Sequence, residues 1–216
     1  MRVAPSVIAA DFTRYQEEIK KIVDAGIDLL HLDVMDGVFV PNITFGPMIV
    51  EAINALTEVE LDAHLMIVKP EKYMRQFIDA GVDWLSFHAE ATDQTQTIID
   101  YIHERGIHAG LALNPETPFE YVKKYMEELD YLLIMTVNPG FYGQKFMSDV
   151  LHKIEAVKKH IETQGLDCLI EVDGGINMSN VDLVNKAGAD MVVAGAGVFK
   201  ADDYREAVSR LQCSTR

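Results

Sequence analysis

The chain has 216 residues, of which 49% are hydrophobic and 25% are charged, and its formal net charge at pH 7 is −15. A chain of this length and composition buries a sizeable core, which excludes global disorder. The acidic excess also makes nucleic acid and anionic membrane surfaces poor partners. An anionic ligand would have to be attracted by a local site instead of by the overall field.

Cysteine usage and the first residues point to a cytoplasmic protein. Cys168 and Cys213 form neither a CxxC pair nor a Cys/His zinc spacing, so reduced thiols are expected. The opening residues MRVAPSVIAADF are interrupted by Pro5 and Ser6, and they predict a strand and not a signal peptide. No apolar run in the sequence has the length of a bilayer crossing.

Short apolar stretches alternate with stretches of helical periodicity along the whole chain. A helix-ending glycine followed by a short apolar strand recurs at residues 24–31, 79–86 and 186–193. The expected strands are 3–9, 28–34, 60–66, 83–87, 107–113, 130–136, 168–173 and 190–194. The expected helices are 13–25, 47–57, 70–80, 92–105, 117–128, 147–162, 178–187 and 202–211.

This alternation indicates an α/β fold with a parallel sheet, because crossover-length connections join parallel strands. Eight units in 216 residues fit a compact (β/α)8 TIM barrel. An open doubly wound sheet is the alternative, but no GxGxxG follows the first expected strand. No linker or composition break is evident, so residues 1–216 are expected to form a single barrel domain.

Charged and imidazole side chains gather where three expected strands end. His31 and Asp33 share one face of the second strand, His64 lies on the third, and Asp173 ends the seventh. The carboxyl ends of barrel strands form the active-site rim. Buried charge is costly unless it is paired or binds a metal, so the four residues predict a divalent metal site. Imidazole and carboxylate ligands suit Zn²⁺ first, and also Fe, Mn or Co.

Glycines cluster after the sixth, seventh and eighth expected strands. Loops at this end of a barrel commonly bind phosphate, because glycine lets backbone N–H groups approach an anion closely. The alternative is that they are ordinary turn glycines. The candidate phosphate-binding residues are Gly140, Phe141, Tyr142, Gly143, Gly174, Gly175, Gly195 and Ala196.

Several neighbours of these motifs have two open interpretations. Met35, Met66 and Met135 are either core filling or an apolar cover that excludes water from the site. His88, after the fourth expected strand, is either a partner of a metal ligand or a plain strand-end residue. Asp36 lies off the ligand face and is expected to shape its loop or support a ligand.

Taken together, the motifs resemble the ribulose-phosphate 3-epimerase family, nearly end to end and in the same order. The resemblance implies a (β/α)8 barrel of the ribulose-phosphate-binding type. The stretches that carry it are APS (4–6), HLDVMDG (31–37), FVPN (39–42), AHLM (63–66), NPETP (114–118), MTVNPGF (135–141) and EVDGG (171–175). Two positions depart from the family pattern, Tyr142 in place of glycine and Ala196 in place of serine.

The resemblance implies a metal-dependent isomerase of carbohydrate metabolism that interconverts D-ribulose 5-phosphate and D-xylulose 5-phosphate in the pentose phosphate pathway. It implies that His31, Asp33, His64 and Asp173 hold the metal. It also implies that Ser6, His64 and Asp173 contact a phosphorylated ketose, whose phosphate the three glycine loops bind.

Epimerisation beside a ketone needs proton removal from one face of the carbon and proton delivery to the other. Two carboxylates on opposite sides of the sugar can do this through an enediolate, one as base and the other as acid. Asp33 and Asp173 lie on strands that are three apart around the expected barrel. They are therefore the candidate acid–base pair.

Other functions stay open at this point. The nearest is a related 3-epimerase acting on D-allulose 6-phosphate, and one of another class is a non-catalytic metal or sugar-phosphate sensor. A phosphate-barrel decarboxylase is disfavoured because the second strand lacks an Asp-x-Lys pair. The outer helix faces are expected to form a homo-oligomer.

Overall fold

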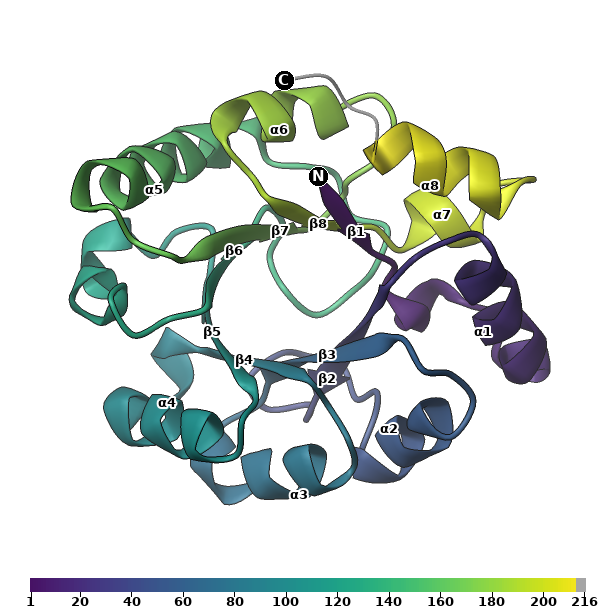
Figure 1. Cartoon of the computed structure of the whole chain (residues 1–216), viewed down its shortest axis with the longest axis horizontal. Coiled ribbons are helices and arrows are strands. Elements are labelled where there is room, and N and C mark those ends of the chain that lie inside the picture. The colour runs from purple at the N-terminus through teal and green to yellow at the C-terminus, as the bar shows by residue number, and fades with distance from the viewer. Residues whose placement is uncertain (213–216) are drawn as a thin grey trace.

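A computed structural model describes residues 1–212 and shows eight parallel strands inside a ring of helices (Figure 1). The sheet has the order β1-β8-β7-β6-β5-β4-β3-β2. This arrangement confirms the expected barrel. The strands are β1 (Arg2–Ala4), β2 (Leu29–Met35), β3 (Glu60–Met66), β4 (Trp84–His88), β5 (His108–Leu113), β6 (Tyr131–Met135), β7 (Leu169–Asp173) and β8 (Met191–Val193).

The helices occupy the connections between the strands. They are α1 (Tyr15–Asp24), α2 (Pro47–Asn54), α3 (Met74–Asp79), α4 (Thr95–Glu104), α5 (Leu151–Gln164), α6 (Val181–Ala187), α7 (Ala196–Phe199) and α8 (Tyr204–Gln212). Short 3₁₀ turns supplement them at Val7–Ala9, Phe12–Arg14, Pro70–Lys72, Ala89–Ala91, Phe119–Tyr121, Lys123–Tyr125 and Ser148–Val150.

The structure differs from the sequence-based expectation in three places, two expected elements and one that was not expected. The strand expected at 3–9 ends at Ala4, because Pro5 has no N–H for a ladder and a 3₁₀ turn follows. The helix expected at 117–128 is a pair of 3₁₀ turns, since apolar residues three apart fit either kind of helix. The four-residue helix α7 was not expected, because its glycines indicated a loop.

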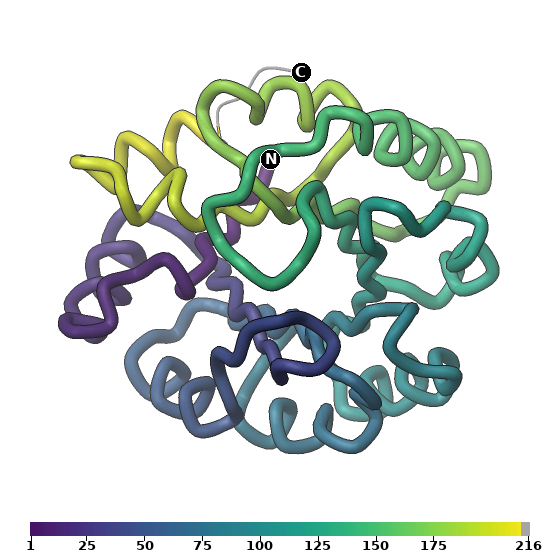
Figure 2. The backbone as a smooth tube through the Cα atoms, turned by 180° about the vertical axis from the view of Figure 1, so that it is seen from behind, coloured from purple at the N-terminus to yellow at the C-terminus, as the bar shows by residue number. Residues whose placement is uncertain are grey.

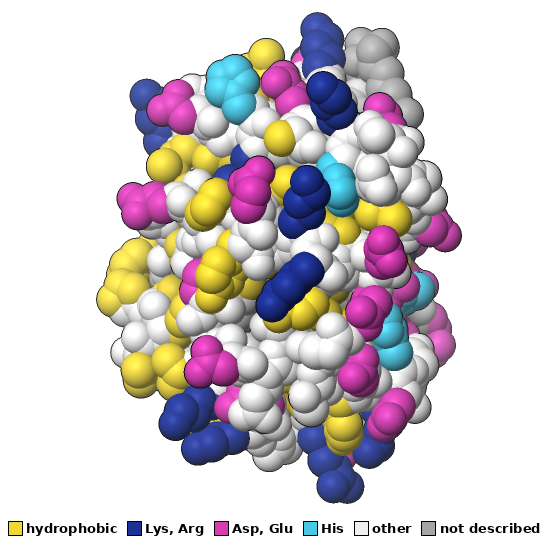
Figure 3. Space-filling model, turned by 90° about the vertical axis from the view of Figure 1, so that its left-hand side faces the viewer, with side chains coloured by type: hydrophobic (Ala, Val, Ile, Leu, Met, Phe, Trp, Pro, Cys, Tyr) yellow, Lys and Arg dark blue, Asp and Glu magenta, His cyan; other side chains and the backbone are white. Residues whose placement is uncertain are grey.

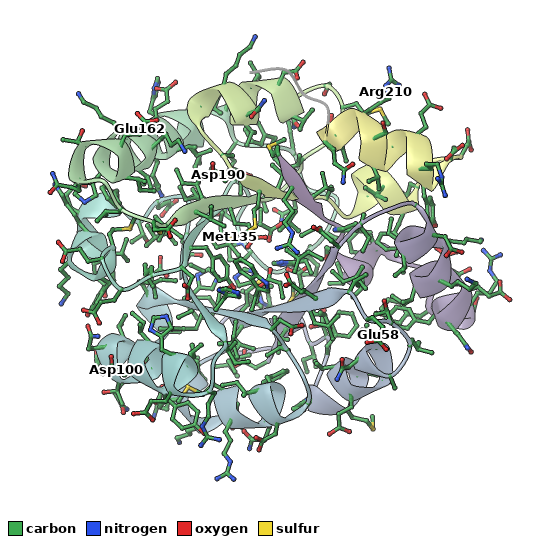
Figure 4. The ribbon with its side chains drawn as sticks, in the orientation of Figure 1. Glu58, Asp100, Met135, Glu162, Asp190 and Arg210 are labelled. Atoms are coloured by element: carbon green, nitrogen blue, oxygen red, sulfur yellow. The ribbon has the colours of Figure 1, made fainter. Side chains whose placement is uncertain are left out.

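The core has an outer and an inner part, as the two-residue period of the strands requires. Alternate side chains pack outward against the helices, and the others fill the barrel, where Leu29, Trp84 and Tyr131 are buried together. Figure 4 shows Met135 near the barrel axis, while Glu162 and Arg210 lie on the outer ring of helices.

The outer surface mixes charges of both signs. On the face at the left of Figure 1, acidic and basic side chains intermingle (Figure 3). Across the described part of the chain, no helix combines the length and apolarity that a bilayer crossing needs. Cys168 is a buried free thiol, and Cys213 lies outside the described residues.

The barrel is nearly closed, and its seam lies between β1 and β2. An isolated parallel bridge pairs Ser6 with His31, and the His31 N–H donates to the Pro5 carbonyl at 3.1 Å. At the opposite end of the seam, the Arg2 guanidinium pairs with Asp28 at 2.9 Å and with Glu60 at 2.6 Å. The first strand is thus attached to β2 at both ends.

Two long loops lie in front of the barrel when it is viewed from behind (Figure 2). They follow β2 and β6, and they meet where Asn42 Nδ2 donates to the Gly140 carbonyl at 2.8 Å. Because both loops leave carboxyl ends of strands, they enclose the end of the barrel at which active sites form.

Candidate active site

A cavity of about 300 Å³ opens at the carboxyl end of the barrel. It is bounded by the ends of β2, β3, β6, β7 and β8 and by the loops that follow three of them. The residues that sequence reasoning placed at the site and that line this cavity are Ser6, Asp33, Met35, Met66, Met135, Gly140, Phe141, Tyr142, Gly143, Asp173, Gly174, Gly175, Gly195 and Ala196.

The four expected metal ligands come together: Asp33 and Asp173 line this cavity, whereas His31 and His64 are fully buried and do not line it. One ligand atom from each of His31, Asp33, His64 and Asp173 lies within 4.8 Å of the other three. Asp33 Oδ1 is 3.5 Å from His31 Nε2 and 3.7 Å from His64 Nδ1. His64 Nδ1 is 3.8 Å from Asp173 Oδ2. Two imidazoles and two carboxylates around one point match the donor set of a divalent transition metal.

The hydrogen bonding of the two histidines fits such an ion. His31 Nε2 and His64 Nδ1 are buried and have no hydrogen-bond partner among the described residues. The other ring nitrogens are occupied, His31 Nδ1 by Asp62 at 2.5 Å and His64 Nε2 by His88 at 2.9 Å. A buried nitrogen without a partner is costly, so each free nitrogen is a fitting metal ligand.

At some positions the glycine loops pack so tightly that they leave no room for a side chain. A Cβ on Gly175, whose φ is +67°, would lie 2.7 Å from the Phe146 nitrogen. A Cβ on Gly197 would lie 2.8 Å from the Ile176 carbonyl oxygen. The loops after β6, β7 and β8 therefore form one assembly, which we call the glycine cradle (residues 140–144, 174–177 and 195–197).

The model of the family described as "Ribulose-phosphate 3 epimerase family" matches residues 2–199. The chain belongs to this family. It is 48% identical over 215 residues to the ribulose-phosphate 3-epimerase of Bacillus subtilis (strain 168), covering 99% of both chains. It is 49% identical to that of Synechocystis sp. (strain ATCC 27184 / PCC 6803 / Kazusa), covering 99% of this chain and 94% of the relative. The resemblance seen in the sequence and the assignment to the isomerases are thereby confirmed.

Solved structures support the same fold. The chain is similar to 3-hexulose-6-phosphate synthase from Salmonella typhimurium, with a TM-score of 0.72 and 18% identity, covering 98% of this chain and 96% of the other. At this level of identity the likeness concerns the fold, and the functional argument depends on the site of the epimerase-family chain itself.

Within this epimerase-family site, the two aspartates have opposite electrostatic environments. Burial raises the pKa of Asp33, but the neighbouring His31 and His64 outweigh this effect and hold it below its usual range. Burial and the charge of Asp33 raise the pKa of Asp173 to about 7. Before a metal binds, Asp33 is thus the ionised carboxylate and Asp173 the one that retains a proton near neutral pH.

The two histidines differ in the same way. Burial lowers the pKa of His64 to about 4. Burial acts in the same direction on His31, but the charges of Asp62 and Asp33 raise its pKa well above the usual value. His64 is therefore neutral at neutral pH, whereas the protonated form of His31 is stabilised by the adjacent negative charge.

Beneath the four candidate metal ligands His31, Asp33, His64 and Asp173, which we call the metal group, lies a buried polar layer that sequence reasoning missed. Asp62 Oδ1 accepts a hydrogen bond from the Tyr131 hydroxyl at 2.7 Å, and Asp62 Oδ2 contacts His31. Both carboxyl oxygens of Glu171 are buried without a hydrogen-bond partner in the described structure, and burial raises its pKa. Asp62 and Glu171 could have been found, because each lies two residues before an expected ligand and therefore on the same strand face.

The remaining predicted residues occupy well-defined positions. The Ser6 hydroxyl donates to Asp33 Oδ2, which links the first strand to the metal group across the seam. Asp36 accepts hydrogen bonds at 2.8 Å from the backbone N–H groups of Val38, Phe39 and Val68, as expected of a residue that shapes its loop.

The three methionines are buried at 5% exposure or less and line the cavity around the metal group. Their positions are compatible with an apolar cover. Further lining residues were not anticipated from the sequence, among them Ile8, Ile176 and Asn177.

Proposed function

We propose that the protein is a metal-dependent epimerase that inverts C3 of D-ribulose 5-phosphate to give D-xylulose 5-phosphate. The observation that carries this proposal is the pair Asp33 and Asp173. Their carboxylates come from strands that are three apart around the barrel when counted through β1 and β8, line one cavity and have pKa values shifted in opposite directions. Such a pair of titratable groups is the usual signature of separate base and acid roles.

In the proposed reaction, Asp33 takes the C3 proton from one face of the ketose. His31, Asp33, His64 and Asp173 would hold a divalent ion, which would supply positive charge against the negative charge that develops on the substrate. Asp173 then gives its proton to C3 on the opposite face. Asp33 ends protonated and Asp173 ionised, so the reverse reaction starts from this state with the roles exchanged.

The rest of the site has supporting roles in this proposal. Ser6 holds Asp33 by its hydroxyl, and Ser6 and His64 lie beside the sugar. Backbone N–H groups of the glycine cradle bind the phosphate, which compensates for the acidic charge of the whole chain. Met35, Met66 and Met135 cover the reacting carbons and exclude water, which would otherwise protonate the intermediate.

A side-by-side assay tests the proposal. The metal-free protein is reloaded with Zn²⁺, Fe²⁺, Mn²⁺ or Co²⁺ and assayed on D-ribulose 5-phosphate and D-allulose 6-phosphate. We expect Zn²⁺ to support turnover and the pentose phosphate to be preferred. A clear preference for D-allulose 6-phosphate would identify the related 3-epimerase instead.

Isotope exchange distinguishes the proposed epimerase from the alternative, a non-catalytic sensor. In D₂O the proposed enzyme replaces the C3 proton of its substrate with deuterium, because the proton passes through a carboxyl group that exchanges with solvent. A sensor would bind metal and sugar phosphate without this exchange.

We also propose a single-domain organisation over residues 1–216, supported by the one eight-stranded sheet. A cytoplasmic location is supported by the buried free thiol of Cys168. The homo-oligomer expected from the sequence stays a prediction, which sedimentation of the metal-loaded protein tests.

A further inference from the structure

A chain of polar contacts runs from the metal ligand His64 to the loop that follows β5. His64 Nε2 lies 2.9 Å from His88 Nε2, and the two rings are stacked with centroids 5.0 Å apart. His88 Nδ1 lies 3.3 Å from Glu90 Oε2. Neither His88 nor Glu90 lines the reaction cavity. The proposed reaction gives neither residue a role.

The Glu90 end of this chain is firmly anchored. Glu90 Oε1 accepts hydrogen bonds from the Asn114 backbone N–H at 2.9 Å and from the Thr117 hydroxyl. Lys153 in turn donates to the Asn114 carbonyl at 2.8 Å, which holds the loop in place. Burial raises the pKa of Glu90, but hydrogen bonds from His88 and the loop outweigh it and lower the pKa to about 2.

The polarity of each contact follows from what each group can donate. An ionised Glu90 only accepts, so His88 Nδ1 must carry the proton of that hydrogen bond. If His88 carries only that one proton, its Nε2 is an acceptor, and the 2.9 Å contact then needs the proton on His64 Nε2. A neutral His64 with its proton on Nε2 has its lone pair on Nδ1, the buried atom that lacks a partner and faces Asp33 and Asp173.

We propose that His88 and Glu90 are positioning residues that act through His64, fixing its ring as the tautomer whose Nδ1 lone pair faces the metal. The inference rests on the proposed metal-dependent function. Phe39 contributes by covering the His88 ring at a centroid distance of 4.7 Å, which limits its rotation. The loop after β5 thereby influences metal binding without touching the metal.

The test measures metal affinity and tautomer separately. Zn²⁺ affinity is determined by competition with a chelating dye, and the tautomer of His64 is read from ¹⁵N chemical shifts of the metal-free protein. Glu90→Ala and His88→Leu are expected to raise the Kd for Zn²⁺ about 10- to 100-fold. In both variants, His64 is expected to become a mixture of tautomers.

Two further variants serve as matched comparisons. His88→Gln restores an acceptor toward His64 and a donor toward Glu90, so its Kd is expected to stay within about 3-fold of the unsubstituted protein. Glu116→Ala removes one exposed carboxylate from the same loop without touching His88 and is expected to leave Kd and tautomer unchanged, which controls for loss of charge alone.

The proposal is overturned if folded Glu90→Ala and His88→Leu keep the original Kd and tautomer, or if His64 in the unsubstituted protein carries its proton on Nδ1. If these variants do not fold, Thr117→Val, which removes only one donor to Glu90, must still raise the Kd about 2-fold for the proposal to stand. If the unsubstituted protein binds no Zn²⁺, the metal part of the proposed function fails, and the tautomer measurement alone decides this inference.

Discussion

The metal group and the glycine cradle share one cavity, but they are built on different principles. The metal group consists of side chains on strands, and its two histidines are each in contact with a buried neighbour, Asp62 or His88. The cradle consists of loop backbone, whose shape depends on the absence of side chains at Gly175 and Gly197. We therefore expect the metal group to lose function when a side-chain functional group is changed. We expect the glycine cradle to lose function when side-chain volume is added.

The largest expected effect is the loss of turnover when a carboxylate of the metal group is removed. Asp33→Asn and Asp173→Asn each remove a carboxylate that serves as proposed ligand and proton carrier, and each is expected to lower kcat about 10³-fold or more. Steady-state kinetics measures the loss, and circular dichroism checks that the fold persists. Asp79→Asn, on the exposed face of α3, is the control and should retain full activity. Near-normal turnover in either active-site variant would remove that residue from the acid–base role.

The next effect tests whether the cradle depends on volume. Gly175→Ala and Gly165→Ala both place a Cβ at positive φ, +67° and +65° respectively, but only the Cβ at residue 175 has atoms within 4 Å. Both variants should lose about 1 kcal/mol of stability from backbone strain. Gly175→Ala should also raise KM about 10-fold, because charge-assisted hydrogen bonds to phosphate are displaced.

Kinetics and thermal unfolding of the two glycine variants separate these contributions. An unchanged KM in folded Gly175→Ala would show that phosphate does not depend on the shape of the cradle. A raised KM in Gly165→Ala would mean that backbone strain at a site remote from the cavity is enough to weaken substrate binding.

The third prediction concerns pH and the metal-free protein. Asp173 has a pKa of about 7 in the folded state, compared with about 3.9 when unfolded. Between these values the folded state binds a proton that the unfolded state has lost. The contribution of Asp173 to the free energy of unfolding is thus fully present below about pH 4 and is lost as the pH rises through 7. The loss amounts to at most about 4 kcal/mol.

Chemical denaturation across pH 4.5 to 8 measures this dependence, and Asp173→Asn should reduce the slope. Glu171, whose pKa is also raised, leaves a residual slope of the same sign. His64, whose pKa is lowered to about 4, acts oppositely between about pH 4 and 6.5, and Asp33, with its lowered pKa, does so only in the more acidic range. An undiminished slope in Asp173→Asn would contradict the raised pKa.

The smallest effect concerns the rim of the cradle. Tyr142 is 53% exposed, and its ring lies 5.4 Å from Lys200 Nζ, a cation–π contact worth about 1 kcal/mol. Tyr142→Ala should change KM about 2- to 3-fold and leave kcat unchanged. Tyr121→Ala, at 55% exposure away from the cavity, is the matched control. Equal KM values for both variants would show that the contact has no part in binding.

The fold was largely predictable because most strands can be recognised in the sequence as short apolar stretches between helical segments. Residues 60–66 were predicted with the observed bounds, since alternating side chains and a run of buried residues mark both ends. The prediction of an α-helix at 117–128 was wrong. The apolar spacing of this segment fits both an α-helix and a 3₁₀ helix, and only tertiary packing decides between them. Helix α7 could not be predicted from a sequence whose glycines favour turns.

The candidate site was predictable for a similar reason, and only in part. The expected ligands are polar residues at the ends of apolar strands, which is a local signal. The contact between Tyr131 and Asp62 joins strands that are not neighbours in the sheet, so no spacing in the sequence reveals it. The contact of His88 with His64 joins neighbouring strands, but it depends on how the two rings stack, which the sequence does not show.

The seam between β1 and β2 has a practical consequence for protein engineering. A single bridge at Ser6 closes the barrel there, and the same residue donates to Asp33. Trimming the first residues, or fusing a bulky tag that displaces Arg2 from Asp28 and Glu60, would loosen Asp33, a proposed metal ligand at the opposite end of the barrel. Affinity tags and immobilisation linkers are better attached away from the first strand.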